Sequence, residues 1–245
     1  RHDRDPDDRR CGDRDRTTVG LGPHTDHRRA ALKTDTADQH WNDQWAAIEA
    51  GSKWLTPEDD VKAWAAGLAP GSRILDLGAG VGRHALWLAG QGFAVTALDA
   101  APEGLAEIDK AGGVDTVLAR MDKLPFDDHA FDHVLSWNVI YHGDEDILLR
   151  TIAEIRRVLK PGGSYMGTML SKRRLPHEQA KYPGREISRN AWVFDAPGTD
   201  KIHPHYFCPA ADLLALFSGF ECLTLEDREH EKPGSWHWHL TMERL

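Results

Sequence analysis

The chain has 245 residues, 40% of them hydrophobic, which is enough for one substantial core and roughly one α/β domain. Its formal net charge is −9, and because residues 1–30 contribute eight Arg and seven Asp (+1), the rest of the chain carries −10. An acidic body argues against a nucleic-acid backbone as the main partner, since phosphate binding requires a basic surface.

Cysteine usage and hydropathy exclude two further classes of protein. The three cysteines, Cys11, Cys208 and Cys222, show no C-x-x-C spacing, so neither a disulfide framework nor a thiolate metal site is indicated. No stretch approaches the roughly 18 apolar residues of a membrane span, and the charged start is unlike a secretory signal. We therefore expect a cytoplasmic protein with no membrane partner.

The first seventy residues divide into two segments. Residues 1–34 alternate Asp and Arg with almost no large apolar side chains, so we expect a disordered, charged tail. Residues 35–69 are expected to form a helical cap, because Trp41, Trp45 and Ile48 recur at helical spacing. These tryptophans fit either of two roles, as part of the core or as an aromatic cover over a bound cation.

The stretch from 73 to 103 predicts strand, glycine turn, helix and second strand. Arg73 to Leu77 is an apolar run typical of a buried strand, and Gly78, Gly80 and Gly82 follow it directly. The second strand ends at Asp99, where a carboxylate can bind the hydroxyls of a ribose. The stretch therefore indicates a nucleoside-cofactor site.

The identity of the cofactor depends on two departures from the dinucleotide fingerprint Gly-x-Gly-x-x-Gly. The third glycine comes one residue early, and Arg83 stands where that fingerprint has glycine. Asp76 also places a carboxylate at the end of the strand, which suits a cationic ligand and would oppose a pyrophosphate. A cationic cofactor is favoured over a nicotinamide or flavin.

Three runs of sequence resemble the class I S-adenosylmethionine (SAM) methyltransferases. Asp76 to Gly82 resembles motif I of that family, residues 124–134 resemble its Leu-Pro-Phe…Phe-Asp-x-Val run, and residues 157–163 resemble its Arg-Val-Leu-Lys-Pro-Gly-Gly run. The likeness covers residues 70–245, and the details of residues 80–99 are similar to the tellurite-resistance and thiopurine-like small-molecule branch. It implies an α/β fold, a doubly wound Rossmann-like seven-stranded sheet with an antiparallel last strand, and SAM as cofactor.

The expected cofactor site combines the turn, the second strand and the residues that the resemblance adds. Through the resemblance, Asp122 is expected to accept from the adenine amino group, with Met121 beside the ring. The family members that methylate base or glutamine nitrogens carry Asn/Asp-Pro-Pro-Tyr/Phe after strand four, and here residues 136–142 lack the proline pair, which argues further against a nucleic acid. The expected cofactor-binding residues are Asp76, Gly78, Ala79, Gly80, Gly82, Arg83, Asp99, Ala100, Met121, Asp122, Asn138, Trp41 and Trp45.

The acceptor is expected to bind in the second half of the chain. Residues 171–208 form a locally basic insertion after strand five, where open α/β sheets place ligand-binding loops, and we expect a substrate lid there. His203/His205 and His237/His239 each recur at i, i+2, but without nearby Cys or a paired carboxylate we predict no metal site. The candidate catalytic residues are His205, His203, Arg185, Lys232 and His237.

Together these features predict a methyltransferase that acts on a small molecule, with an anionic oxygen or a thiol or chalcogen as nucleophile. Two alternatives stay open: a SAM-binding module without catalysis, and, less favoured, a tRNA or other nucleic-acid methyltransferase. The sequence leaves open whether the protein is a monomer or a homodimer.

Overall fold

The structure is a computed structural model that describes residues 36–245. The predicted tail of residues 1–34 lies outside the described residues. The strands are β1 (Arg73–Leu77), β2 (Ala94–Asp99), β3 (Asp115–Leu118), β4 (Phe131–Ser136), β5 (Leu159–Ser171), β6 (Gly184–Ser188), β7 (Ala191–Phe194), β8 (His205–Cys208), β9 (Phe220–Glu229) and β10 (Trp236–Arg244). The α-helices are α1 (Ala37–Ala46), α2 (Asp59–Ala65), α3 (Arg83–Gly90), α4 (Pro102–Ala111), α5 (Glu145–Val158), α6 (Leu175–Gln179) and α7 (Ala210–Leu216), with 3₁₀ turns η1 (Lys53–Leu55), η2 (Lys172–Arg174) and η3 (Asp200–Ile202).

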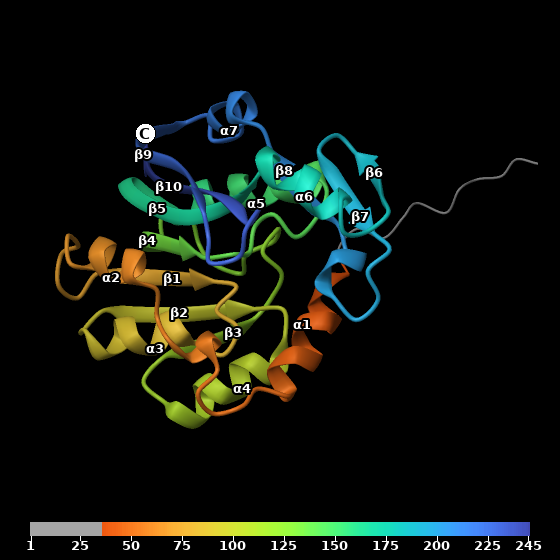
Figure 1. Cartoon of the computed structure of the whole chain (residues 1–245). Helices are drawn as coiled ribbons and strands as arrows, with labels where there is room; N and C mark the ends of the chain where they lie inside the picture. Colours follow the sequence, from red (N-terminus) through yellow and green to blue (C-terminus); the bar gives the residue numbers. More distant parts are fainter. Residues whose placement is uncertain (1–35) are drawn as a thin grey trace, which may run out of the picture. The chain divides into compact units, whose positions relative to one another are not determined.

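Seven strands form the central sheet in the order β3-β2-β1-β4-β5-β10-β9 (Figure 1). The first five pair in parallel, and β10 runs antiparallel to both β5 and β9. The predicted seven-stranded sheet with an antiparallel last strand is confirmed. The chain order reverses between β1 and β4, and such a switch point is where open α/β sheets bind ligands at the carboxyl ends of their strands.

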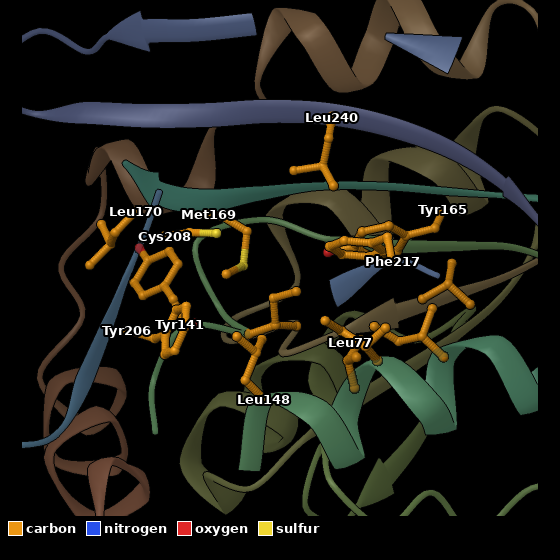
Figure 2. Packing of buried hydrophobic residues seen from close by; sticks show 14 of the residues in the cluster. Leu77, Tyr141, Leu148, Tyr165, Met169, Leu170, Tyr206, Cys208, Phe217 and Leu240 are labelled. Atoms are coloured by element: carbon orange, nitrogen blue, oxygen red, sulfur yellow. The ribbon is translucent and has the colours of Figure 1, made fainter. Parts of the chain in front are cut away.

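The sheet is buried on both faces, which explains the continuous apolar run of β1. Ile74 packs in one core with side chains of α2, α3 and α4, whereas Leu75 and Leu77 pack in the other core with side chains of α5. Figure 2 shows part of this second core, where the rings of Tyr165 and Phe217 stack at 5.4 Å between centroids. Helices on both faces of a mostly parallel sheet make the fold doubly wound.

A second, smaller group of strands extends the central sheet beyond the end of β4. There β8 pairs in parallel with the last residues of β5, through Leu170 with Phe207 and Ser171 with Cys208. Next to β8, β7 and then β6 continue as antiparallel neighbours. This extension, together with η2, α6 and η3, is the predicted insertion of residues 171–208, which therefore has its own hydrogen-bonded structure.

The predicted helical segment of residues 35–69 contributes to two parts of the structure. Val61 and Ala65 of α2 are buried in the same core as Ile74 and Leu88, so α2 belongs to the layers of the domain. The helix α1 instead contacts the start of α4, where Glu103 N donates to the side chain of Asn42 at 3.0 Å. Across the described residues 36–245, no helix combines the length and apolarity needed to cross a membrane.

Candidate active site

The glycine turn after β1 is compact enough that two of its glycines have no room for a side chain. Gly78 and Gly80 have φ of +76° and +55°, a region that L-residues other than glycine adopt with strain. A Cβ would lie 2.4 Å from Val139 at the first position and 2.9 Å from the ring of Trp45 at the second. The turn therefore brings main-chain atoms directly against the residues that surround it.

A cavity opens above this turn, at the carboxyl ends of β1, β2 and β4, and we call it the turn cavity. One wall is aromatic, because Trp41 and Trp45 of α1 stack at 5.3 Å between centroids and Trp54 of η1 contacts both rings edge-on. The residues around the cavity are Ala37, Asp38, Trp41, Trp45, Trp54, Gly78, Ala79, Gly80, Val81, Arg83, His84, Leu98, Asp99, Ala100, Ala119, Arg120, Met121, Trp137, Asn138, Val139 and His142.

Two carboxylates lie at the turn. Asp99, at the end of β2, accepts hydrogen bonds from the backbone N–H groups of Gly80 and Ala101, both at 2.8 Å, and burial raises the pKa of its carboxyl. Asp76 lies within β1 and is 1% exposed; burial raises its pKa to about 7, although the nearby Arg83 opposes this rise. A bound cation near Asp76 would favour its ionised form.

Several buried polar atoms around the turn cavity have no hydrogen-bond partner among the described residues. They are Oδ2 of Asp76, Nε2 of His142 and the indole Nε1 atoms of Trp41, Trp45 and Trp137. Buried polar groups are normally paired, so such a group of unpaired atoms around one cavity indicates a polar ligand. The cavity thus offers donors and a carboxylate acceptor to a ligand with mixed chemistry.

Asn138 lies between the turn cavity and a second cavity. Its φ is +62°, which is uncommon for a residue other than glycine and is often found at functional sites. The hydroxyl of the buried Thr168 accepts from the Asn138 backbone N–H at 2.8 Å and donates to its Oδ1 at 3.0 Å, which holds the conformation.

We call the second cavity the outer cavity, and it shares one wall with the turn cavity. The residues that border both are Trp41, Trp54, Arg83, Trp137 and Asn138. On the far side, the outer cavity is lined by residues of α6, of η3 and of the β9–β10 hairpin. Two ligands in these cavities would therefore meet at this common wall.

Three positive side chains of the outer cavity lie beside carboxylates. Arg174 donates to Glu178 at 2.8 Å, and Arg83 donates to Glu58 at 2.8 Å. Lys201 lies 3.4 Å from Asp200, and burial lowers its pKa. The cavity therefore alternates the two signs of charge, although the insertion of residues 171–208 is locally basic in sequence.

Histidines form another part of the lining. The ring of His237 donates from Nδ1 to the carbonyl of Ser235 at 2.9 Å and accepts at Nε2 from Arg174 at 3.1 Å. Its pKa is lowered to about 2, mainly by burial and then by His230 and Arg174. His230 stacks on His237 at 3.9 Å between centroids, so His237 is held as a neutral acceptor beside a guanidinium.

Where the two cavities approach each other below α1, three side chains from distant segments converge. Asp200 Oδ2 lies 3.1 Å from His205 Nε2 and 3.7 Å from His142 Nε2. His142 borders the turn cavity and Asp200 borders the outer cavity, whereas His205 is fully buried behind them. The sequence analysis selected only His205 from this group.

Most of the predicted cofactor residues border the turn cavity. The exceptions are Asp76 and Gly82, which lie beneath it, and Asp122. The carboxylate of Asp122 pairs instead with Arg120 at 3.3 Å and Arg150 at 3.0 Å, so its predicted contact with an adenine has no support from the cavity lining. Those that do border the cavity are Gly78, Ala79, Gly80, Arg83, Asp99, Ala100, Met121, Asn138, Trp41 and Trp45.

The predicted catalytic residues are divided between the outer cavity and other places. His237 and Lys232 line the cavity, the second at an exposed position. Arg185 is exposed on β6 and borders neither cavity, and His203 turns its ring to the hydroxyl of Thr36 at 2.8 Å. Residues of the outer cavity that the sequence did not single out include Tyr141, Arg174, Glu178, Asp200, Lys201, His230 and His239.

The sheet order, the glycine turn and the acid at the end of β2 define a class I methyltransferase fold with a nucleoside-cofactor cavity. Comparison with known proteins agrees. Residues 74–163 match the family model described as a methyltransferase domain. The chain therefore contains a class I SAM-dependent methyltransferase domain, whose cofactor is S-adenosylmethionine.

One relative shows how far the sequence similarity reaches. The sarcosine/dimethylglycine N-methyltransferase of Halorhodospira halochloris is 32% identical over 181 residues, which are 68% of this chain and 57% of that protein. The chain thus spans little more than half the length of that relative. Its name places that relative outside the tellurite-resistance and thiopurine branch, so the finer resemblance gains no support from it.

Two solved structures share the fold at lower identity. A SAM-dependent methyltransferase of Methanosarcina mazei has a TM-score of 0.65 and 21% identity, over 78% of this chain and 99% of that one. The 1,6-didemethyltoxoflavin-N1-methyltransferase of Burkholderia thailandensis, with S-adenosylhomocysteine bound, has a TM-score of 0.60 and 20% identity, over 85% of this chain and 84% of that one. At this identity the likeness concerns the fold alone.

Proposed function

We propose that this protein transfers the methyl group of SAM to a nitrogen of a small zwitterionic acceptor, one that carries an amine and a carboxylate. The observation that carries the proposal is the outer cavity, which shares a wall with the turn cavity and alternates cations with carboxylates. A zwitterion fits such a lining better than a simple anion, because each of its charges finds an opposite one.

The name of a related protein supports nitrogen as the acceptor atom. The relative from Halorhodospira halochloris is named as an N-methyltransferase of sarcosine and dimethylglycine. The oxygen, thiol or chalcogen acceptor expected from the sequence has no such support, and it stays a prediction that the same assay tests.

The turn cavity suits SAM by the chemistry of its lining. We assign the ribose hydroxyls to Asp99, the positive charge of the cofactor to the field of Asp76 and the aromatic wall, and the adenine ring to the neighbourhood of Met121. When bound, SAM supplies an electrophilic methyl group for direct displacement by the acceptor. Because Gly78 and Gly80 have no Cβ, the space that a side chain would occupy at the turn stays open.

The residues of this chain would then act mainly by positioning. Trp41, Trp54 and Trp137 border both cavities and exclude water from the place where the two ligands meet. Arg174 and Lys201 hold the acceptor carboxylate, with Glu58 and Glu178 toward its ammonium group. Alignment of two reactants in this way can lower a barrier by about 7–11 kcal/mol.

An ammonium must lose its proton before its nitrogen attacks, and this requires a proton acceptor in the outer cavity. Tyr141 is a poor one, because burial raises the pKa of its hydroxyl above the ordinary value. The proton can pass instead to a carboxylate at the cavity wall, such as Glu58 or Glu178.

The proposal is tested by measuring S-adenosylhomocysteine release with the purified full chain. The acceptor panel contains glycine, sarcosine, dimethylglycine, an amine without a carboxylate, a carboxylate without an amine, an alkyl thiol, a catechol, tellurite and bulk tRNA. We expect turnover with the amino carboxylates and little with either half-molecule. Turnover confined to a thiol, an oxygen acid or tRNA would contradict the acceptor, and tight SAM binding with no turnover at all would favour a binding module.

A further inference from the structure

We propose that His142, Asp200 and His205 bind a divalent transition-metal ion at the boundary of the two cavities. One ligand atom from each residue lies within 4.8 Å of the other two, and within residues 36–245 no other group of three potential metal ligands meets this condition. Two imidazoles and one carboxylate are a common donor set for such ions. The inference does not depend on the proposed function, because it concerns binding alone.

The hydrogen bonds of the two histidines fix where their lone pairs point. His142 Nδ1 lies 2.8 Å from the carbonyl of Val139, and His205 Nδ1 lies 2.8 Å from the carbonyl of His203. A carbonyl oxygen only accepts, so each ring donates from Nδ1 and, when neutral, keeps a lone pair at Nε2. Metal-binding histidines usually donate their other ring N–H to a carbonyl or carboxylate in this way.

These lone pairs converge on an atom that is itself an acceptor. The Nε2 atoms lie 3.1 Å (His205) and 3.7 Å (His142) from Oδ2 of Asp200. A hydrogen bond at the 3.1 Å contact needs a proton on His205 Nε2 in addition to the one on Nδ1, and a metal ion among the three atoms would take the place of that proton. His142 Nε2 is in addition buried without a hydrogen-bond partner among the described residues.

The spacing of the three atoms is close to that of metal ligands. With bonds of about 2.0–2.1 Å, tetrahedral ligand atoms lie roughly 3.3 Å apart. The separation of 3.1 Å between Asp200 and His205 already fits, and the 3.7 Å between Asp200 and His142 is longer by about 0.4 Å.

The ammonium of Lys201 is the competing cation. It lies 3.4 Å from Asp200 Oδ2 and carries the same sign as a metal ion, so the two would repel each other. Within the described part of the chain, however, Lys201 donates no hydrogen bond to either Nε2 atom, and so it leaves those lone pairs available. Arg174 is a second positive group toward the same cavity, and Glu178 opposes it.

The donor set indicates the class of ion. Two imidazole nitrogens favour Zn²⁺, Co²⁺, Ni²⁺ or Fe²⁺ over Mg²⁺ and Ca²⁺, which prefer oxygen ligands. Since three protein ligands leave coordination positions open, an ion here could also bind a carboxylate or hydroxyl of a ligand in the outer cavity, which Asp200 borders.

The experiment uses the full chain, freed of metal with a chelator and then titrated with Co²⁺ or Zn²⁺. Cobalt binding is followed by its visible absorption and zinc binding by calorimetry and by metal content after gel filtration. The variants are Asp200→Asn and His142→Gln, which keep size and hydrogen-bonding capacity, and thermal unfolding checks that each is folded. The matched control is His203→Ala, because this ring lies two residues from His205 but contacts Thr36.

We expect one equivalent of metal in the wild type beyond that in Asp200→Asn or His142→Gln, and at least a tenfold loss of affinity in each, since even indirect supporting residues cost about 10–100-fold. His203→Ala should bind like the wild type. Because the wild type and the variants share all the other histidines of the full chain, metal binding by those histidines cancels in the difference between them. Equal binding by the wild type and Asp200→Asn, or no binding by a folded wild type, would overturn the proposal, as would loss in His203→Ala alone.

Discussion

The turn cavity and the outer cavity share a wall, but the chain builds them in different ways. The polar floor of the turn cavity comes from one stretch, residues 76–100, in which a strand, a turn and a second strand follow one another directly. The outer cavity takes side chains from positions as far apart as His40 and His239. A local stretch can place a few backbone groups and carboxylates with little help, whereas the outer cavity depends on the whole fold. Single-residue variants in each cavity test this contrast.

The largest expected effect concerns the pH dependence of stability at Asp76. Burial raises the pKa of this group to about 7 from an ordinary value of 3.8, so the folded protein binds its proton more tightly than the unfolded chain. Its stabilising contribution is complete below about pH 4 and is lost as the pH rises to about 7. Asp76→Asn, a neutral mimic, should therefore match the wild type near pH 4 and exceed it near pH 8, by at most about 4 kcal/mol.

Chemical denaturation at both pH values, without SAM, measures this difference. The control is Asp115→Asn, which removes a carboxylate from an exposed position on β3. Parallel stability curves for Asp76→Asn and the wild type would show that folding does not raise the pKa of Asp76. The same variant should also bind SAM more weakly, since a cationic ligand loses an opposite charge.

The next largest effect is on cofactor affinity. Asp99→Ala removes the proposed acceptor for the ribose and also two hydrogen bonds that hold the turn, so we expect SAM binding to weaken at least tenfold, since hydrogen bonds to charged groups contribute about 1.5–3 kcal/mol each. Calorimetry gives the affinity directly. Asp122→Ala is the control, because this carboxylate does not itself border the turn cavity. If the two variants lose equal affinity, the assignment of Asp99 is wrong.

A smaller and more selective effect is expected in the outer cavity. Arg174→Met should lower kcat/KM for the acceptor by roughly tenfold, through loss of a charge-assisted contact, and leave the affinity for SAM unchanged. Steady-state kinetics and calorimetry separate the two quantities. Arg185→Met removes an exposed guanidinium of the same insertion, and its kinetics should equal those of the wild type. Loss of SAM affinity in Arg174→Met would mean that the two cavities are not energetically separate.

The smallest effect is expected at His237. Because its pKa is lowered to about 2, this ring stays neutral between about pH 5 and 8, the range in which histidines usually titrate. His237→Gln keeps an acceptor for Arg174, so it should change kcat/KM by no more than about twofold and leave the shape of the pH profile intact. If the pH profile of the wild type shows a titration that is missing from the profile of His237→Gln, His237 acts as a proton carrier.

The predictability of the molecule follows the same contrast. The seven-stranded sheet could be predicted because each strand is a short apolar run that ends in turn residues, and Gly78, Gly80 and Asp99 could be predicted because their spacing is local. The exposed position of Arg185, outside both cavities, could not be predicted, because nothing in the sequence shows that β6 is an exposed edge of the insertion. The group of His142, Asp200 and His205 could not be predicted either, because Asp200 comes close to the two rings only through tertiary folding.

The pairing of β8 with β5 also has a consequence for engineering. The insertion begins after Ser171 at the end of β5. It ends in β8, where Phe207 pairs with Leu170 and Cys208 pairs with Ser171, so its two ends are fixed about one strand spacing, 4.8 Å, apart. A segment with closed ends can be lengthened or exchanged at small entropic cost, because each doubling of length costs only about 0.6 kcal/mol. Residues 172–204 are therefore a natural unit for transplantation between methyltransferases, provided that its contacts with Thr36 and His142 are kept.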